Sequence, residues 1–265
     1  MNLNKKNIID FYTLGDKLRK QNRFGSSQSY SSNNFGGMLI AYLYNIEHPI
    51  TNDISKVLRI IAMSNMLTIN TSARCIFENM NKGKQYMSEI YEYYAQDSIE
   101  SIFALSCREY DNNLSKFLDK CNNEKGNNLY ETVKNNRVIP NDIDLKNIFD
   151  IYSFEKQKNI VKDNSNADSI YGSIILALAL DSEGYSPSNI DRVIEMLLLS
   201  KLDRENLLCI DKNSHIKSIL EEYDNNKTKD SNFANYCSNL ESNIHNYSIE
   251  NSNLDLVKLV LTKSK

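Results

Sequence analysis

The sequence is poor in residues that interrupt helices, and it has no marker of export or of membrane insertion. Its 265 residues include only 3 Pro and 8 Gly, and no Trp. Leu, Ile, Lys, Glu and Asn are abundant, a composition typical of long helices with polar faces. Residues 1–9 lack the apolar core of a signal peptide, and no run approaches the roughly 18 apolar residues of a membrane span. The sequence therefore predicts a cytoplasmic, all-α protein with no membrane partner.

Paired cysteines are absent as well. The five cysteines are odd in number and widely spaced, with no CxxC pair: Cys75, Cys107, Cys121, Cys209 and Cys237. This spacing predicts neither a disulfide framework nor a zinc site. We interpret these residues as buried free thiols.

Charge of one sign is also scarce. The chain is 41% apolar and 25% charged, with a net charge of -3. This balance is typical of an ordinary globular protein and gives no strong electrostatic bias toward nucleic acid or anionic membranes. A nucleic-acid partner is not indicated.

The sequence does contain an internal repeat that runs through most of the chain. Residues 147–154 (NIFDIYSF) match 7–14 (NIIDFYTL) at an offset of 140, which is 147 minus 7. Two further matches occur in the same order, 171–200 with 35–64 at an offset of 136 and 231–237 with 101–107 at an offset of 130. One match could reflect helical periodicity alone, but the conserved order and spacing favour a duplication.

The duplication divides the chain into two units with a linker between them. Residues 122–142 are polar and carry the Gly and Pro punctuation of a loop. We therefore predict a first helical repeat at 1–125, a linker at 126–142 and a second repeat at 143–265. Within each repeat the apolar spacing is helical and period-two alternation is nowhere sustained, so no sheet is predicted. Asn52-Asp53 and Ser188-Asn189 precede the third helix of each repeat, where short polar side chains are expected to cap it.

Both repeats resemble the HD-domain phosphohydrolases, in particular the 5'-deoxynucleotidase-like branch. Leu18-Arg19 followed by Arg23-Phe24-Gly25 fits that branch's LK-x-x-x-R-x-G-W pattern, with Ser26 in place of Trp. Residues 57–63 (VLRIIAM) fit its V-L-R-M-A-L helix, and 222–233 fit its E-Y-E-x-x-x-T helix. Since members of this family often pair as homodimers, the resemblance implies two HD-like bundles packed as a pseudo-dimer in a monomeric chain.

The resemblance does not extend to the metal ligands. The family holds divalent metal with a first His, a His-Asp pair and a distant Asp. In the first repeat these positions carry Asn34, Ser64-Asn65 and Arg108, and in the second repeat they carry Ile170, Ser200-Lys201 and Ser238. The acid that follows the pair is replaced by Thr68 and Arg204. Because Ile, Lys and Arg cannot serve as metal ligands, the resemblance implies no catalytic residue, metal or cofactor.

The sequence contains no other recognisable set of catalytic residues. The three histidines, His48, His215 and His245, are not paired by spacing, so exposed or capping roles are expected for them. The carboxylates Glu89, Glu92 and Asp97 are interpreted as solvated helix surface. Gly36-Gly37 is interpreted as a close helix contact and not as a phosphate-binding loop.

One set of residues in the first repeat is consistent with a binding site. On the family's layout, Arg23, Asn34, Ser64, Asn65 and Arg108 converge on the position of metal and phosphate. A cationic, hydrogen-bonding cavity of this kind could hold an anion directly, although the residues could equally be polar remnants of a decayed site.

Three functions therefore remain, in the following order. The first is a catalytically inactive HD-like pseudoenzyme that acts as a binding or regulatory protein, through an unidentified protein partner. The second is a metal-independent nucleotide- or phosphate-binding module for a small anionic ligand. The third is a nucleotide phosphohydrolase with rewired chemistry, which would require a residue of perturbed pKa in a cleft.

Overall fold

The computed structural model describes residues 5–18, 21–22, 28–123, 146–161, 165–185 and 187–250. The predicted all-α class is confirmed for these residues, which form twelve helices and no strand, with only an isolated bridge between Asn22 and Ser29. The helices are α1 (Lys5–Lys17), α2 (Tyr30–Glu47), α3 (Ile54–Ile69), α4 (Thr71–Glu78), α5 (Gly83–Ala95), α6 (Ile99–Asn123), α8 (Lys146–Val161), α9 (Ser165–Ser182), α10 (Ile190–Leu199), α11 (Arg204–Cys209), α12 (His215–Asn225) and α13 (Lys229–Glu250). The predicted linker at 126–142 lies outside the described residues.

Short polar side chains fix the starts of several helices. Asp53 accepts a hydrogen bond from the Lys56 amide at 2.9 Å, and Asn189 accepts from the Asp191 and Arg192 amides at 3.0 and 3.2 Å. Both caps predicted for the third helices are therefore confirmed. Each satisfies first-turn N–H groups that have no partner within the helix.

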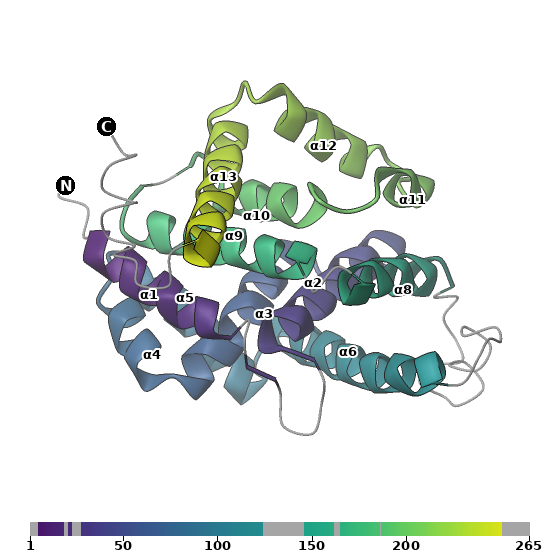
Figure 1. Ribbon diagram of the computed structural model, residues 1–265, viewed down its shortest axis with the longest axis horizontal. Coiled ribbons are helices and arrows are strands. Elements are labelled where there is room, and N and C mark those ends of the chain that lie inside the picture. Colours follow the sequence, from purple (N-terminus) through teal and green to yellow (C-terminus); the bar gives the residue numbers. More distant parts are fainter. Residues whose placement is uncertain are drawn as a thin grey trace.

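Helices α2 and α9 lie at the centre of the molecule and pack against each other (Figure 1). Almost every side chain from Ser31 to Leu43 on α2, and from Ile170 to Ser182 on α9, is buried. Helix α9 is apolar over most of this stretch, as expected of a helix that is buried on all sides, whereas α2 also buries four polar residues in its first turns, Ser31, Ser32, Asn33 and Asn34. The apolar residues of the two halves form one continuous core.

The two halves contain corresponding helices that make corresponding contacts. Helix α2 packs against α3 and α6, and α9 packs against α10 and α13 in the same way. Helices α5 and α12 complete the two sets, each packing against the third and last helix of its own half. No helix of the described residues is long and apolar enough to cross a bilayer.

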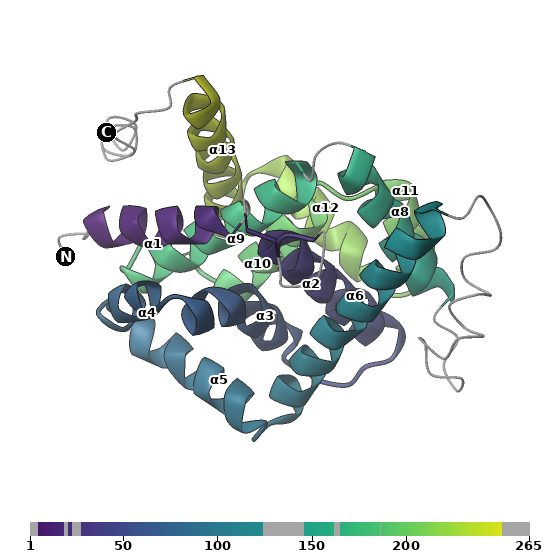
Figure 2. The ribbon, with the colours of Figure 1, turned by 60° about the horizontal axis from the view of Figure 1, so that its bottom comes forward.

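The first helix of each half lies on the other half. Helix α1 packs against α9 as well as against α4 of its own half, and α8 packs mainly against α2, so each first helix reaches across to the other half. Both views place α1 and α8 on opposite sides of the molecule (Figures 1 and 2). Each half therefore completes its packing with a helix from the other half.

Candidate functional site

Four of the five residues predicted to form a binding site are described, and α2, α3 and α6 bring them close together. Asn34 lies on α2, Ser64 and Asn65 lie on α3, and Arg108 lies on α6. Asn34 and Ser64 are fully buried and Asn65 is nearly so. Arg23, the fifth predicted residue, lies outside the described residues.

Three of these side chains form one hydrogen-bonded chain. Asn65 Nδ2 donates to Asn34 Oδ1 at 2.6 Å, and Asn34 Nδ2 donates to the Ala62 carbonyl at 3.3 Å. Arg108 Nη2 donates to Asn65 Oδ1, and Nη1 donates to the Tyr93 hydroxyl at 2.6 Å. The guanidinium carbon also lies 5.8 Å from the centre of the Tyr93 ring, within reach of a cation–π interaction. The Arg108 guanidinium therefore lies among these polar side chains, and its hydrogen-bond acceptors, Asn65 and Tyr93, are both neutral.

Ser64 is not part of this hydrogen-bonded chain. Its hydroxyl donates to the Ile61 carbonyl of its own helix at 3.2 Å, and its carbonyl accepts from Thr68 and from Tyr94 at 3.3 Å. Thr68 is also hydrogen-bonded to the Tyr94 hydroxyl. Ser64 thus satisfies local backbone groups and does not face Asn34 or Arg108 with its hydroxyl.

One hydrogen-bond donor of Arg108 is not used by the contacts described above. Arg108 Nε is buried and has no hydrogen-bond partner among the described residues. The α2 backbone comes close to this side chain because Gly37 lacks a Cβ, which would lie 3.2 Å from Arg108 Cγ. A buried N–H without an acceptor is uncommon and is a suitable donor for an anion.

The corresponding centre of the second half is built differently. Ile170 is fully buried, and Lys201 Nζ donates to the Ser169 hydroxyl, which in turn donates to Glu241 Oε2 at 2.7 Å. The hydroxyl of Ser200 donates to the Leu197 carbonyl at 3.2 Å. An apolar side chain and an ammonium group thus stand where the first half has two amides.

The sequence analysis missed a buried ion pair next to the first-half centre. Asp111, one turn after Arg108 on α6, is fully buried. Its Oδ2 accepts from Asn33 at 2.6 Å, and its Oδ1 accepts from the Tyr152 hydroxyl at 2.7 Å and pairs with Lys156 Nζ at 2.9 Å. Tyr152 and Lys156 belong to α8, so the second half supplies the partners of Oδ1, including the counter-charge, while Asn33 of α2 binds Oδ2. No local spacing connects residues so far apart in the sequence.

A second charged cluster lies where α3 meets α10. Arg59 donates to both carboxylate oxygens of Glu89, at 3.0 and 2.8 Å, and also pairs with Asp191. The prediction that Glu89 lies on a solvated face is wrong, because its side chain is only 11% exposed. Burial raises the pKa of Glu89 above its ordinary value, and Arg59 opposes that shift.

The cysteines are only partly as predicted. Cys107 and Cys237 are buried free thiols, and burial raises the pKa of each. Cys75 and Cys209 are exposed, which corrects the prediction for these two. Within the described part of the chain, no group of three or more His, Cys, Asp or Glu side chains is placed to hold a metal ion.

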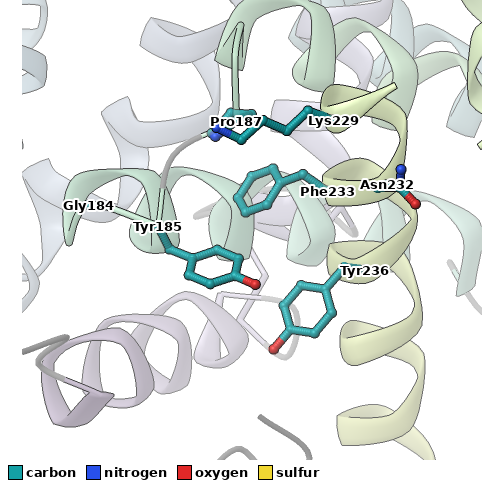
Figure 3. A pocket seen from close by; sticks show the side chains of 7 residues that line it. All are labelled: Gly184, Tyr185, Pro187, Lys229, Asn232, Phe233 and Tyr236. Carbon is teal, nitrogen blue, oxygen red and sulfur yellow. The ribbon is translucent and has the colours of Figure 1, made fainter. Parts of the chain in front are cut away.

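A surface cleft with a volume of about 430 Å³ lies between the end of α9 and the start of α13 (Figure 3). It is lined by Gly184, Tyr185, Pro187, Lys229, Asn232, Phe233 and Tyr236. The sequence analysis did not single out these residues. In the sequence, this region is marked only by a Gly-Tyr-x-Pro segment directly after an apolar helix. Such a segment is typical of the end of a helix and does not indicate a binding site.

Comparison of the chain with known proteins gives no match to a family model, to a curated protein or to a solved structure.

Proposed function

We propose that this chain is a catalytically inactive HD-like pseudoenzyme that acts as a binding or regulatory protein. The observation that carries the proposal is the place of Arg108. Its guanidinium stands where the resemblance puts the last metal-ligating Asp, and it is bound by Asn65 and Tyr93. Two amides and a permanent cation offer no anionic ligand to a divalent metal, and the cation repels it.

The proposal includes two HD-like bundles that pair as a pseudo-dimer within one chain. Reciprocal contacts between α3 and α10 support this part. The Ser55 hydroxyl donates to Glu195 at 3.3 Å, and Arg59 pairs with Asp191. The repeat offset of 136 relates position 55 to 191 and position 59 to 195. In an interface with two-fold symmetry, residue i meets residue j while j meets i, which is the pattern seen here.

The exchange of the first helices also supports the pseudo-dimer. Positions 12 and 16 of α1 correspond to Tyr152 and Lys156 of α8 at the repeat offset of 140. Helix α8 brings the latter two residues to Asp111 in the first half. A chain that completes each half with a helix from the other half buries within itself the surface that two separate chains would bury together.

A second candidate function, metal-independent binding of a nucleotide or phosphate at the same centre, is favoured by one observation. Arg108 Nε has no acceptor among the described residues, so an anion oxygen could accept its hydrogen bond. A rewired nucleotide phosphohydrolase ranks last, because the described residues at the centre are Asn, Ser, Arg, Thr and Tyr, with no group suited to act as general base near neutral pH.

Phosphate release from deoxynucleoside monophosphates, measured with and without Mn²⁺ or Co²⁺, tests the proposal. We expect no metal-dependent release from the natural chain. The matched variant carries Asn34→His, Ser64→His, Asn65→Asp and Arg108→Asp, which restores the family's ligands in the first half. Metal binding by this variant, but not by the natural chain, supports an HD-like frame that has lost its site. Metal-dependent turnover by the natural chain contradicts the proposal.

Calorimetric titration of the metal-free chain with the same nucleotides separates the two candidate functions. Binding that is lost in Arg108→Ala, and kept in the exposed control Arg74→Ala, favours the anion-binding centre. If neither the natural chain nor Arg74→Ala binds a nucleotide, the result favours a pseudoenzyme that acts through a protein partner.

A further inference from the structure

We infer that the cleft between α9 and α13 is a binding site for a small molecule that combines a flat aromatic ring with an anionic group. This site is separate from the polar centre around Arg108 and does not depend on whether that centre is catalytic. The inference depends on three properties of the cleft: the way its walls are fixed, its aromatic lining and its unpaired cation.

The first wall is set by the end of α9. Gly184 adopts a φ of 96°, a left-handed conformation that glycine tolerates without strain. Its amide donates to the Asp181 carbonyl at 3.0 Å, and the Tyr185 amide donates to the Leu180 carbonyl at 2.9 Å. This pair of bonds is the Schellman arrangement, which ends the helix and fixes the direction of the next residue. Tyr185 is therefore held in place by backbone geometry.

The second wall is α13, and a carboxylate ties it to the first. Asp230 Oδ1 accepts from the Ser188 and Asn189 amides at 2.6 and 2.9 Å. The Thr228 hydroxyl accepts from the Ser231 amide at 3.0 Å and caps the start of α13. With both walls fixed in this way, the cleft is formed before any ligand arrives, which reduces the entropic cost of binding.

Three aromatic rings line the cleft. The Tyr185 ring centre lies 5.9 Å from that of Phe233 and 6.2 Å from that of Tyr236. Phe233 is buried, whereas Tyr185 is 51% exposed although it lies against two other rings. Figure 3 shows the hydroxyl ends of Tyr185 and Tyr236 turned toward each other, with Phe233 above them. A group of tilted rings that includes the half-exposed Tyr185 is suited to accept a further flat ring.

A cation completes the site. Lys229 is exposed, and none of the ion pairs formed among the described residues includes it. It lies in the first turn of α13, where the partial positive charge of a helix N-terminus disfavours a second positive charge. The neighbouring carboxylate of Asp230 is already occupied by two backbone amides. An anionic group on the ligand would complement both the ammonium group and the helix terminus.

The size of the cleft and the repeat alignment agree with this assignment. A volume of about 430 Å³ lies within the range of roughly 300–1,000 Å³ of small-molecule sites. At the repeat offsets, Tyr185 corresponds to Pro49, Tyr236 to Ser106 and Lys229 to Ile99. The fold of a half therefore does not require these tyrosines or this lysine. They distinguish the second half from the first.

Titration followed by nuclear magnetic resonance and calorimetry tests the site, with 2-naphthoate and benzylphosphonate as probes. Neither probe is a phosphate ester, so turnover at the polar centre cannot mimic or hide binding. We expect at least one probe to bind about tenfold more tightly than 2-naphthamide, which lacks the charge, and than inorganic phosphate, which lacks the ring. The chemical-shift changes should centre on residues 184–189 and 229–236.

Three variants show whether the binding occurs in the cleft. Lys229→Gln should weaken binding of the anionic probe about fivefold or more and leave the affinity for 2-naphthamide unchanged. Tyr185→Ala should weaken binding of both. Lys227→Gln removes an exposed lysine that lies just before α13 and does not line the cleft, and this variant should bind like the natural chain. Circular dichroism checks that each variant is folded.

Two results would overturn the inference. One is that neither anionic probe binds more tightly than the two controls. The other is that a probe binds with equal affinity to the natural chain, to Lys229→Gln and to Tyr185→Ala, because its site would then lie elsewhere.

Discussion

At the residue scale, two clusters of buried charge, around Arg59 and around Asp111, are held by ion pairs. Arg59 is 6% exposed and Asp111 is fully buried, yet each meets opposite charge and further hydrogen bonds. A buried charge that keeps its partner is tolerated, whereas a buried charge that loses its partner is strongly destabilising. Single substitutions in these clusters should therefore have effects far larger than those on the surface.

Arg59→Met should lower the free energy of unfolding by about 3–5 kcal/mol, because it leaves the buried Glu89 carboxylate without a counter-charge. Urea unfolding measures the change. The double variant Arg59→Met with Glu89→Gln should lose less stability than the sum of the two single variants, since they share one interaction. Arg74→Met is the surface control, because its pair with Glu78 of the same helix is screened by solvent, and it should change stability far less than Arg59→Met.

The pair between His215 and Glu195 should make stability depend on pH. His215 Nε2 lies 3.0 Å from Glu195 Oε2, and this hydrogen bond raises the pKa of the histidine above its ordinary value. A raised folded-state pKa means that the stabilisation is complete below about pH 6.5, the pKa in the unfolded chain, and is lost as the pH rises through the folded-state pKa.

The difference in urea midpoint between the natural chain and His215→Gln measures this effect. It should be larger at about pH 5.5 than at about pH 8.5. His245→Gln, which removes an exposed histidine, controls for general pH effects. An equal difference at both pH values would show that the pair contributes no charge-dependent stability.

At the element scale, α2 depends on close approach to its neighbours. The interpretation of Gly36-Gly37 as a close helix contact is confirmed: a Cβ on Gly36 would overlap Asp111 Oδ1 and lie 2.6 Å from Lys156 Nζ. The helix interior would otherwise favour alanine by about 1 kcal/mol, so packing opposes helix propensity at this position.

Gly36→Ala should therefore destabilise the protein by about 3 kcal/mol, because the added methyl group displaces one side of the buried pair between Asp111 and Lys156. Thermal unfolding measures the loss. The neighbouring Gly37→Ala is the matched control: its Cβ would meet Arg108 and Ile61 side chains at 3.2 and 3.3 Å, and its effect should stay within about 1 kcal/mol. A loss from Gly36→Ala no larger than that from Gly37→Ala would contradict the role given to this glycine.

At the scale of the whole molecule, the exchange of α1 and α8 connects the two halves more strongly than one polypeptide link would. The core is continuous across both halves, and the counter-charge of Asp111 comes from Lys156 of α8. In the proposed pseudo-dimer, one chain makes the contacts that two chains would otherwise make, so we expect a monomer of 30.5 kDa in solution.

Cutting the chain in the linker predicted at 126–142 tests this picture. A protease site inserted there should be cleaved without separating the fragments, because α1 remains packed on α9 and α8 on α2. Native mass spectrometry and size exclusion should detect one complex with the mass of the intact chain. Fragments that elute apart after cleavage under native conditions would show that the exchanged helices contribute little to the association.

The sequence by itself determined the all-α class, the caps at Asp53 and Asn189 and the grouping of Asn34, Asn65 and Arg108. The class and the caps follow from local rules, which are helical periodicity and short polar side chains at helix starts, and the grouping was expected only from the resemblance. Only the tertiary structure decided which half each first helix covers, what neutralises Asp111 and Glu89, and where Tyr185 meets Tyr236. Such contacts join residues many positions apart, and burial, not spacing, selects them, because a charge or a ring removed from water must find its partner wherever the packing places one.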